Sequence, residues 1–222
     1  MKKFIAMLAM VLPMTAMAQE MKDTTVVLPA EEYAFIMAAQ LAQYGYANND
    51  ALSLITAARM AKQNGFSAEA REKQEQASEA TAAPTGQKRG QISLDPTKLL
   101  ADARAMAAGN EVLGDLAQEV EQMGTRGATN GSIYHTDCVN AHATDIYTVT
   151  FTGGIPAIVT AVGDGDTDLD LYIYDQNGNL IAQDIDYTDR CICTWTPRWT
   201  GSFRIKIVNR GSVYNCYVLR TN

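Results

Sequence analysis

The stretch that decides the fold of the second half of this chain is residues 163–178, Gly-Asp-Gly-Asp-Thr-Asp-Leu-Asp-Leu-Tyr-Ile-Tyr-Asp-Gln-Asn-Gly. Within it Leu169, Leu171 and Ile173 alternate with polar or aromatic residues, which is typical of a strand with one buried face. Asn177-Gly178 then supplies a residue pair that favours a tight hairpin turn. The stretch therefore predicts one strand and one hairpin of an antiparallel sheet.

The same alternation continues on both sides of this stretch. It occurs at residues 146–151 and again at 203–207, where Phe203, Ile205 and Ile207 oppose Arg204 and Lys206. Turn signals separate these runs, including Gly153-Gly154, Pro197 and Gly211. Seven or eight short strands at this spacing predict that residues 128–222 form an antiparallel, jelly-roll-like β-sandwich.

Residues 163–178, together with Trp195-Thr-Pro-Arg-Trp-Thr-Gly-Ser-Phe203 and Tyr214-Asn-Cys-Tyr217, resemble the bacterial pre-peptidase C-terminal domain family. The resemblance covers about residues 130–222. It implies a β-sandwich module of the kind appended to secreted proteases and other exported enzymes, with a non-catalytic accessory role. Some relatives bind calcium or extracellular polymers. The resemblance does not cover the helical half. This chain departs from the family in that no protease catalytic domain precedes the module, and its four cysteines are not a defining family feature.

The first half of the chain, up to Gly127, has the composition of helices. Pro29 opens a segment that should end at Gly45, with apolar residues at helical spacing: Tyr33, Ile36, Met37, Leu41 and Tyr44. A second helix should run from caps at residues 48–50 to Gly65. Asp95-Pro96 begins a third, which stops at Gly109, and a fourth should end at Gly124.

These helices predict an α+β, multidomain chain in which two helical hairpins, residues 19–66 and 93–127, precede the β-sandwich. Residues 67–92 between the hairpins contain almost no large apolar side chain. Such a segment cannot offset the entropy of ordering, so we expect a flexible linker there.

Residues 1–18 have the three zones of a secretory signal peptide: Lys2 and Lys3, an apolar run from Phe4 to Leu12, and an Ala-Met-Ala motif ending at Ala18. The apolar run is too short to span a bilayer, and no later segment is apolar enough. We therefore expect an exported protein, periplasmic or secreted, with no membrane span.

The net charge of −7 argues against nucleic-acid binding, which needs a basic surface, and against docking on anionic lipid. Only two histidines are present, so most multi-histidine metal enzymes are excluded. The chain also lacks the Gly-x-Ser-x-Gly, His-Glu-x-x-His, Walker and Rossmann motifs. These absences favour a protein that is not an enzyme.

An acidic cluster in the second half suggests calcium, the one cofactor we expect. On an extended strand alternating carboxylates would share one face, and calcium takes about six to eight oxygen ligands. The candidate ligands are Asp164, Asp166, Asp168, Asp170 and Asp175. The spacing departs from an EF-hand, because Leu169 stands where that loop needs glycine. The alternative is a solvated acidic edge that prevents aggregation.

The four cysteines lie in the β half, and an even number in an exported chain predicts two disulfides. Cys191 and Cys193 share a face of one strand, at a Cα separation awkward for pairing with each other. Each is therefore expected to reach a different strand, using Cys138 and Cys216. A zinc site with His135 and His142 is one alternative, and a Cys–His hydrolase using Cys138 is another.

Trp199, Tyr172 and Tyr174 are candidates for an aromatic ligand surface, although aromatic residues also serve as core packing. We therefore expect an exported, non-catalytic accessory or binding module that contacts a protein or an extracellular polysaccharide. The alternatives are an envelope assembly factor acting through the helical hairpins, or the Cys–His hydrolase.

Overall fold

The computed structural model describes residues 27–76, 92–124 and 133–222. In this part of the chain four helices precede most of the strands: α1 (Ala30–Asn48), α2 (Ala51–Asn64), α3 (Pro96–Met106) and α4 (Glu111–Gln122). The strands are β1 (Ser67–Ala68), β2 (Gln74–Gln76), β3 (Ile133–Val139), β4 (Thr144–Phe151), β5 (Ala157–Gly163), β6 (Leu169–Tyr174), β7 (Leu180–Asp184), β8 (Arg190–Trp195), β9 (Gly201–Asn209) and β10 (Asn215–Thr221). The α+β class is confirmed.

The strands form two sheets that face each other as a sandwich. Sheet A has the order β1-β3-β10-β5-β8 and sheet B the order β2-β4-β9-β6-β7. All described pairings are antiparallel except the one between β1 and β3. The predicted alternation is confirmed, because Leu169, Leu171 and Ile173 of β6 and Ile205 and Ile207 of β9 are buried between the sheets.

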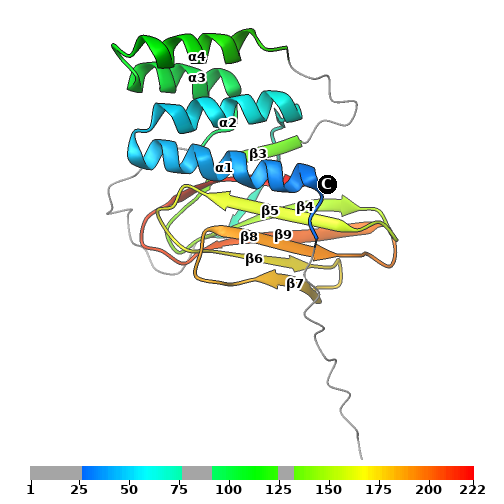
Figure 1. Cartoon of the computed structure of the whole chain (residues 1–222). Coiled ribbons are helices and arrows are strands. Elements are labelled where there is room, and N and C mark those ends of the chain that lie inside the picture. The colour runs from blue at the N-terminus through cyan, green and yellow to red at the C-terminus, as the bar shows by residue number, and fades with distance from the viewer. Residues whose placement is uncertain (1–26, 77–91, 125–132) are drawn as a thin grey trace, which may run out of the picture.

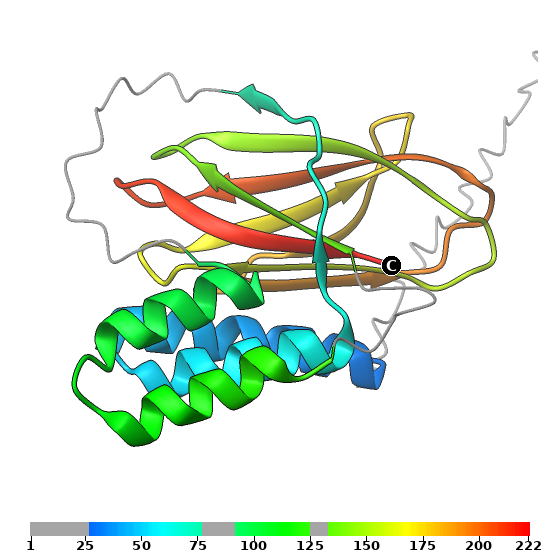
Figure 2. The ribbon, with the colours of Figure 1, turned by 90° about the horizontal axis from the view of Figure 1, so that it is seen from above.

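The helices form a third layer that covers the outer face of sheet A (Figure 1). Tyr134, Val162 and Val218 of that face belong to one apolar cluster with Phe35 of α1 and Leu54 of α2. Every residue of β5 is buried, because that strand has the sandwich interior on one side and the helices on the other. The two halves of the chain, expected as separate units, are therefore packed against each other, as Figure 2 also shows.

Residues 67–76 differ from the expected linker, because they hold β1 and β2. The segment pairs first with the edge of sheet A and then with the edge of sheet B, through β3 and β4. Backbone pairing and polar contacts, not apolar burial, keep it ordered, so hydrophobicity gave no signal for it. The rest of the expected linker, residues 77–91, lies outside the described residues, as does the predicted signal peptide.

Helix α1 corrects two details of the sequence analysis. It does not stop at Gly45 but continues to Asn48. Gly45 is a packing residue, since a Cβ there would lie 2.5 Å from the Leu54 side chain of α2. Tyr33, Met37 and Tyr44, expected on the apolar face, are exposed instead. The buried face of α1 includes the small residues Ala38, Ala39, Ala42 and Gly45, which allow close approach of neighbouring elements.

The starts of α2 and α3 follow the predicted capping, but α3 ends at Met106 and not at Gly109, and α4 ends at Gln122 and not at Gly124. Asp50 and Asp95 cap α2 and α3 with their side chains, and Pro96 occupies the first turn of α3. Gly65 ends α2 in the left-handed conformation that glycine favours. None of the helices in the described ranges is both long and apolar enough to cross a membrane.

A buried ion pair joins the helical layer to sheet A. Arg220 of β10 contacts the carboxylate of Glu32 on α1, and the two residues are 6% and 1% exposed. The Arg220 guanidinium also lies 6.0 Å from the centre of the Phe35 ring. Removing one partner would leave the other charge buried and uncompensated.

We predict that Arg220→Leu lowers the free energy of unfolding by about 3 kcal/mol, as for other broken buried ion pairs. The double variant Glu32→Leu/Arg220→Leu should recover most of this loss, because it removes both charges. The matched control Arg104→Leu breaks an exposed pair with Glu121 and should cost less than about 1 kcal/mol. Urea unfolding measures all three, and equal effects of Arg220→Leu and Arg104→Leu would contradict the prediction.

Candidate functional site

The outer face of sheet B is the candidate binding surface. Alternation along β6 and β9 turns Leu171, Ile173 and Ile205 inward, and so turns Tyr172, Tyr174, Arg204 and Lys206 outward. The helices of the described ranges lie on the opposite side of the sandwich (Figure 1). This sheet face therefore meets solvent, whereas the outer face of sheet A does not.

Tyr172 and Tyr174 lie side by side on this face. Their ring centres are 6.4 Å apart and the ring planes differ by 25°. The ammonium of Lys206 lies 5.2 Å from the centre of the Tyr174 ring, within the range of a cation–π contact. Two nearly parallel rings at this distance form an aromatic pair with polar atoms at its margin.

The Tyr172 ring is held in place through its hydroxyl. That hydroxyl donates to Asp170 at 3.0 Å and accepts from the Arg210 guanidinium at 2.9 Å. Arg210 in turn donates to Asp170 through its Nε at 2.5 Å, and this contact raises the pKa of Arg210. Burial and the hydrogen bond to Asp170 raise the pKa of Tyr172, so the phenol stays neutral at physiological pH.

Strand pairing places one row of outward residues across all five strands of sheet B. The row follows from the registers of β2 with β4, β4 with β9, β9 with β6, and β6 with β7. It consists of Gln74, Ile146, Lys206, Tyr172 and Gln183. With neighbouring strands ~4.8 Å apart, the row is about 19 Å long, so the face suits an extended ligand better than a small compact one.

Trp199 lies at the end of sheet B where the hairpin after β6 turns. Its side chain is 52% exposed. A Cβ on Gly201 would lie 3.5 Å from the Trp199 ring and 3.6 Å from the Gln176 side chain, so these two side chains flank the start of β9. A Cβ on Gly153 would meet the backbone of Trp199 at 2.6 Å, which shows how closely two loops pack under this ring.

The acidic residues predicted to bind calcium have separate roles. Asp164 accepts from the backbone N–H of Cys216 at 2.9 Å, Asp170 pairs with Arg210, and Asp175 accepts hydrogen bonds within its own hairpin. The expectation that alternating carboxylates share one strand face is wrong, since residues 164–168 form a turn and β6 begins only at Leu169.

Neighbouring carboxylates affect Asp168. Burial and the charges of Asp170 and Asp186 raise its pKa. Within the described residues, however, no group of three or more His, Cys, Asp or Glu side chains is placed to hold a metal ion. Asp166 also lies in the 164–168 turn, with its N–H bonded to Asp164. Calcium binding stays a prediction.

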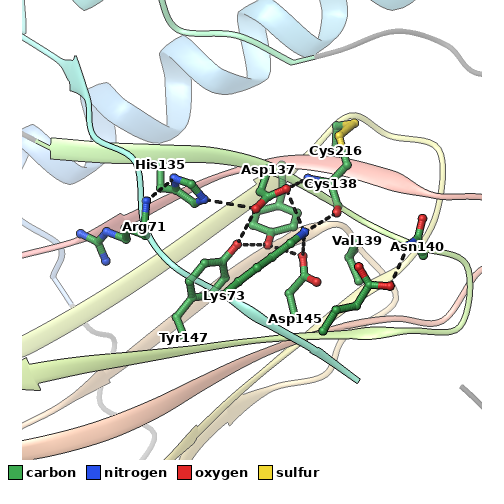
Figure 3. Close-up of polar contacts among 12 residues, drawn as sticks. Arg71, Lys73, His135, Asp137, Cys138, Val139, Asn140, Asp145, Tyr147 and Cys216 are labelled. Atoms are coloured by element: carbon green, nitrogen blue, oxygen red, sulfur yellow. Dashed lines mark hydrogen bonds and ion pairs between the residues drawn. A yellow bond between two sulfur atoms is a disulfide. The ribbon is translucent and has the colours of Figure 1, made fainter. Parts of the chain in front are cut away.

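A second polar cluster lies where residues 67–76 cross from sheet A to sheet B (Figure 3). The Lys73 ammonium donates to Asp137 at 2.8 Å, to the carbonyl oxygen of Cys138 at 2.9 Å and to Asp145 at 3.0 Å. Tyr217 donates to the same Asp145 oxygen at 2.7 Å and lies 2.5 Å from the Tyr147 hydroxyl. The other Asp145 oxygen is buried without a hydrogen-bond partner among the described residues.

The two carboxyl groups around Lys73 differ in pKa. Burial favours the neutral form of Asp137, but hydrogen bonds from Lys73 and from the N–H of Cys138 outweigh it and hold its pKa below the usual range. At Asp145 burial dominates and raises the pKa, despite hydrogen bonds from Tyr217 and Lys73. The pKa of Lys73 is raised, since these contacts outweigh its own desolvation.

Next to this cluster a cavity of about 350 Å³ opens between residues 69–72 and 147–150. The Nδ1 of His135 lies 3.0 Å from the carbonyl oxygen of Glu69 and 3.2 Å from the backbone nitrogen of Arg71, two residues that line this cavity. The imidazole therefore serves as an attachment point for the crossing segment. His142 has a positive φ of 53° in the turn before β4 and is exposed.

The expected pairing of the cysteines is wrong. Cys138 and Cys216 bond to each other across β3 and β10, where they are direct partners with Cα atoms 3.8 Å apart. Cys191 and Cys193 of β8 are free and buried. Their thiols point toward sheet B, where the Cys191 sulfur donates to the Leu169 carbonyl at 3.0 Å. Sheet A places β8 two strands away from β10, so no second disulfide forms.

The same observations contradict the hydrolase and zinc hypotheses as stated. The sulfur of Cys138 is bonded to Cys216 and cannot act as a nucleophile. Burial raises the pKa of the Cys191 thiol, and it raises the pKa of Cys193 to about 12, so neither thiol ionises at neutral pH.

The sequence analysis missed Arg71 and Lys73, because their segment was interpreted as a linker. One signal could have found Lys73. Asp145 has the same parity as Tyr147, so it points into the sandwich, and a buried carboxylate needs a compensating group. The β half contains a single lysine, Lys206, and it lies on the outer face. The cation therefore had to come from outside that half or from an arginine.

Comparisons with known proteins find structural similarity at low identity. No protein-family model matches the chain, and no curated protein matches it. The pre-peptidase C-terminal domain of a collagenase from Bacillus anthracis is similar with a TM-score of 0.37 and 10% identity, covering 41% of this chain and 89% of that domain. The periplasmic g-type lysozyme inhibitor PliG of Aeromonas hydrophila has a TM-score of 0.32 and 11% identity, covering 44% and 92%.

A third similar structure is the Clostridium thermocellum xylanase 10B fragment in complex with xylohexaose, with a TM-score of 0.25 and 9% identity, covering 39% of this chain and 24% of that one. At these values none of the three assigns a family or a function to this chain. Membership of the pre-peptidase C-terminal domain family stays a prediction.

The cysteine arrangement predicts two free thiols per chain. In denaturant a thiol reagent should modify Cys191 and Cys193 and leave the Cys138–Cys216 disulfide intact. In native buffer the same reagent should react slowly, since both thiols are buried with raised pKa values. The variant Cys191→Ala/Cys193→Ala is the control and should show no thiol. A wild-type count of zero, as for two disulfides, would contradict the structure.

We predict that Lys73→Met lowers the free energy of unfolding at pH 7 by about 2 kcal/mol, somewhat less than for a fully buried pair because Lys73 and Asp137 are partly exposed. The variant leaves Asp145 buried without its cation. Its pKa should rise further, and the variant should gain stability as the pH falls from 7 to 5.

The wild type should show a smaller gain over the same interval, because hydrogen bonds from Tyr217 and Lys73 limit the rise in the pKa of Asp145. Asp137, whose pKa is depressed, contributes stability that is present above its unfolded pKa and is lost only as the pH falls through its lower folded value. Urea unfolding at both pH values measures the difference. Lys98→Met, which breaks the exposed pair with Asp102, is the control. The same pH trend in Lys73→Met and Lys98→Met would contradict the proposed role of Lys73.

Proposed function

We propose that this chain is an exported, non-catalytic binding module that contacts an extracellular polysaccharide through the outer face of sheet B. The observation that carries the proposal is the nearly parallel pair of Tyr172 and Tyr174 on a sheet face left open to solvent. Rings in this arrangement are preorganised, because the Asp170–Arg210 contact fixes Tyr172 before any ligand arrives.

The chemistry of the row fits a sugar polymer. Sugar rings combine apolar faces, which pack on aromatic side chains, with hydroxyl groups that need hydrogen-bond partners. Gln74 and Gln183 at the two ends of the row are exposed amides that both donate and accept. The length of the row, about 19 Å, allows several units of one chain to be bound at once.

A protein contact through the helical layer is the second candidate function. One stripe of α1 exposes Tyr33, Met37 and Tyr44, which are each more than half exposed. These residues recur on one side of the helix at intervals of four and seven, and exposed apolar side chains at such spacing are typical of helix-mediated contacts. This candidate predicts binding that does not depend on Tyr172 and Tyr174.

We predict that Tyr172→Ala/Tyr174→Ala reduces retention on polysaccharide at least about tenfold. The magnitude is taken from the stacking of nucleic-acid bases on aromatic side chains, where loss of one ring costs on the order of 1–3 kcal/mol. A glycan array followed by titration of the best glycan measures the effect. Tyr187→Ala is the matched control, because Tyr187 is 97% exposed in the turn between β7 and β8. Equal binding by the double variant and the wild type would overturn the proposal.

A further inference from the structure

We infer that the polysaccharide bound by the outer face of sheet B carries carboxylate groups, and that Arg204 and Lys206 recognise them. This inference rests on the proposed function and names the chemical class of its ligand. It follows from the charges on the face, from their position relative to the tyrosine rings and from the absence of competing acids among the described residues.

The outer face of sheet B carries three cations, and of these only Arg210 forms an ion pair within the described residues. Arg210 is paired with Asp170 at the margin of the face. Neither Arg204 nor Lys206 has a described carboxylate within ion-pair distance, although Lys206 contacts the Tyr174 ring. In a chain of net charge −7, two adjacent cations on one sheet face that pair with no acid of the described ranges are a local exception.

Both cations lie directly beside the tyrosines. In the register of β6 with β9, Tyr172 is opposite Lys206 and Tyr174 is opposite Arg204. Cross-strand partners have Cβ atoms about 4.5–5.5 Å apart, so a carboxylate on a sugar stacked over either ring lies within reach of a cation. The other outward neighbours of the two cations, Thr148 and Ile146 of β4, are uncharged.

The hairpin after β6 makes room for the Arg204 guanidinium. Gly178 has a φ of +87°, and a Cβ there would lie 3.4 Å from an Arg204 nitrogen. The guanidinium thus lies against a bare backbone, where its planar fork stays accessible to a carboxylate with two parallel hydrogen bonds. The flanking glutamine amides favour a hydroxyl-rich polymer.

The test compares polygalacturonate with its fully methyl-esterified form, because the two share a backbone and differ in carboxylate charge. Titrations use the full chain at one fixed ionic strength. The wild type should bind polygalacturonate at least about tenfold more tightly than the ester, the size expected when hydrogen bonds to a charged group are lost. Arg204→Gln/Lys206→Gln should abolish this preference, so that the variant binds polygalacturonate no more tightly than the ester.

Arg59→Gln is the matched control, since Arg59 is an exposed arginine on α2, in the helical layer on the other side of the sandwich. It should behave as the wild type, and thermal unfolding should show all variants folded. Equal wild-type affinity for acid and ester, or no binding of polygalacturonate, would overturn the inference. If both polymers bind equally and Tyr172→Ala/Tyr174→Ala abolishes both, the proposed function stands and only the carboxylate class fails. If the tyrosine variant binds both as the wild type does, the proposed function itself fails.

Discussion

Burial of Val162 and Val218 beneath α1 turns sheet A into a middle layer, with apolar side chains on both of its faces. A sheet with two apolar faces cannot stand at the surface of a sandwich without a cover, and the two helical hairpins supply it. The covering is specific as well as apolar, because the buried Glu32–Arg220 ion pair forms only when α1 lies correctly on β10. Within the described ranges the helices cover the outer face of sheet A and leave the outer face of sheet B uncovered.

The crossing segment, residues 67–76, solves a different problem. A β-sandwich has open edges where unpaired backbone groups invite association with another chain. Here β1 adds to sheet A and β2 adds to sheet B at the same edge, so one short segment covers both. Its side chains are largely polar, and the buried contacts of Lys73 with Asp137 and Asp145 replace the apolar anchoring that such a segment lacks. The disulfide of Cys138 closes the same edge strand onto β10.

Sequence patterns predicted the elements whose side chains follow a simple period. The two-residue alternation of β6 and β9 gave their inner and outer faces, and so placed Tyr172 and Tyr174 outward, while Asp50 and Asp95 marked helix starts. What the patterns could not give depends on contacts between distant segments. Gly45 is a stop signal in isolation, yet Leu54 uses it as a packing site. Cys191 and Cys193 were each expected to form a disulfide with another strand. Their spacing shows that they share one face of β8, but it does not show that this face points at sheet B.

The candidate site carries the positive charges of Arg204 and Lys206, whereas the whole chain has a net negative charge. An acidic chain repels an acidic polymer at long range, but at physiological ionic strength such repulsion fades over about 8 Å, whereas contacts with Arg204 and Lys206 act at hydrogen-bond distance. Recognition of a carboxylate here would therefore depend on what happens after contact, not on electrostatic steering toward the surface. Recognition after contact is consistent with a face on which the Tyr172 ring is held in place before a ligand arrives. Tyr172 is fixed by Asp170 and Arg210, so a sugar ring that stacks on it brings its own substituents to cations whose positions the strand register has set.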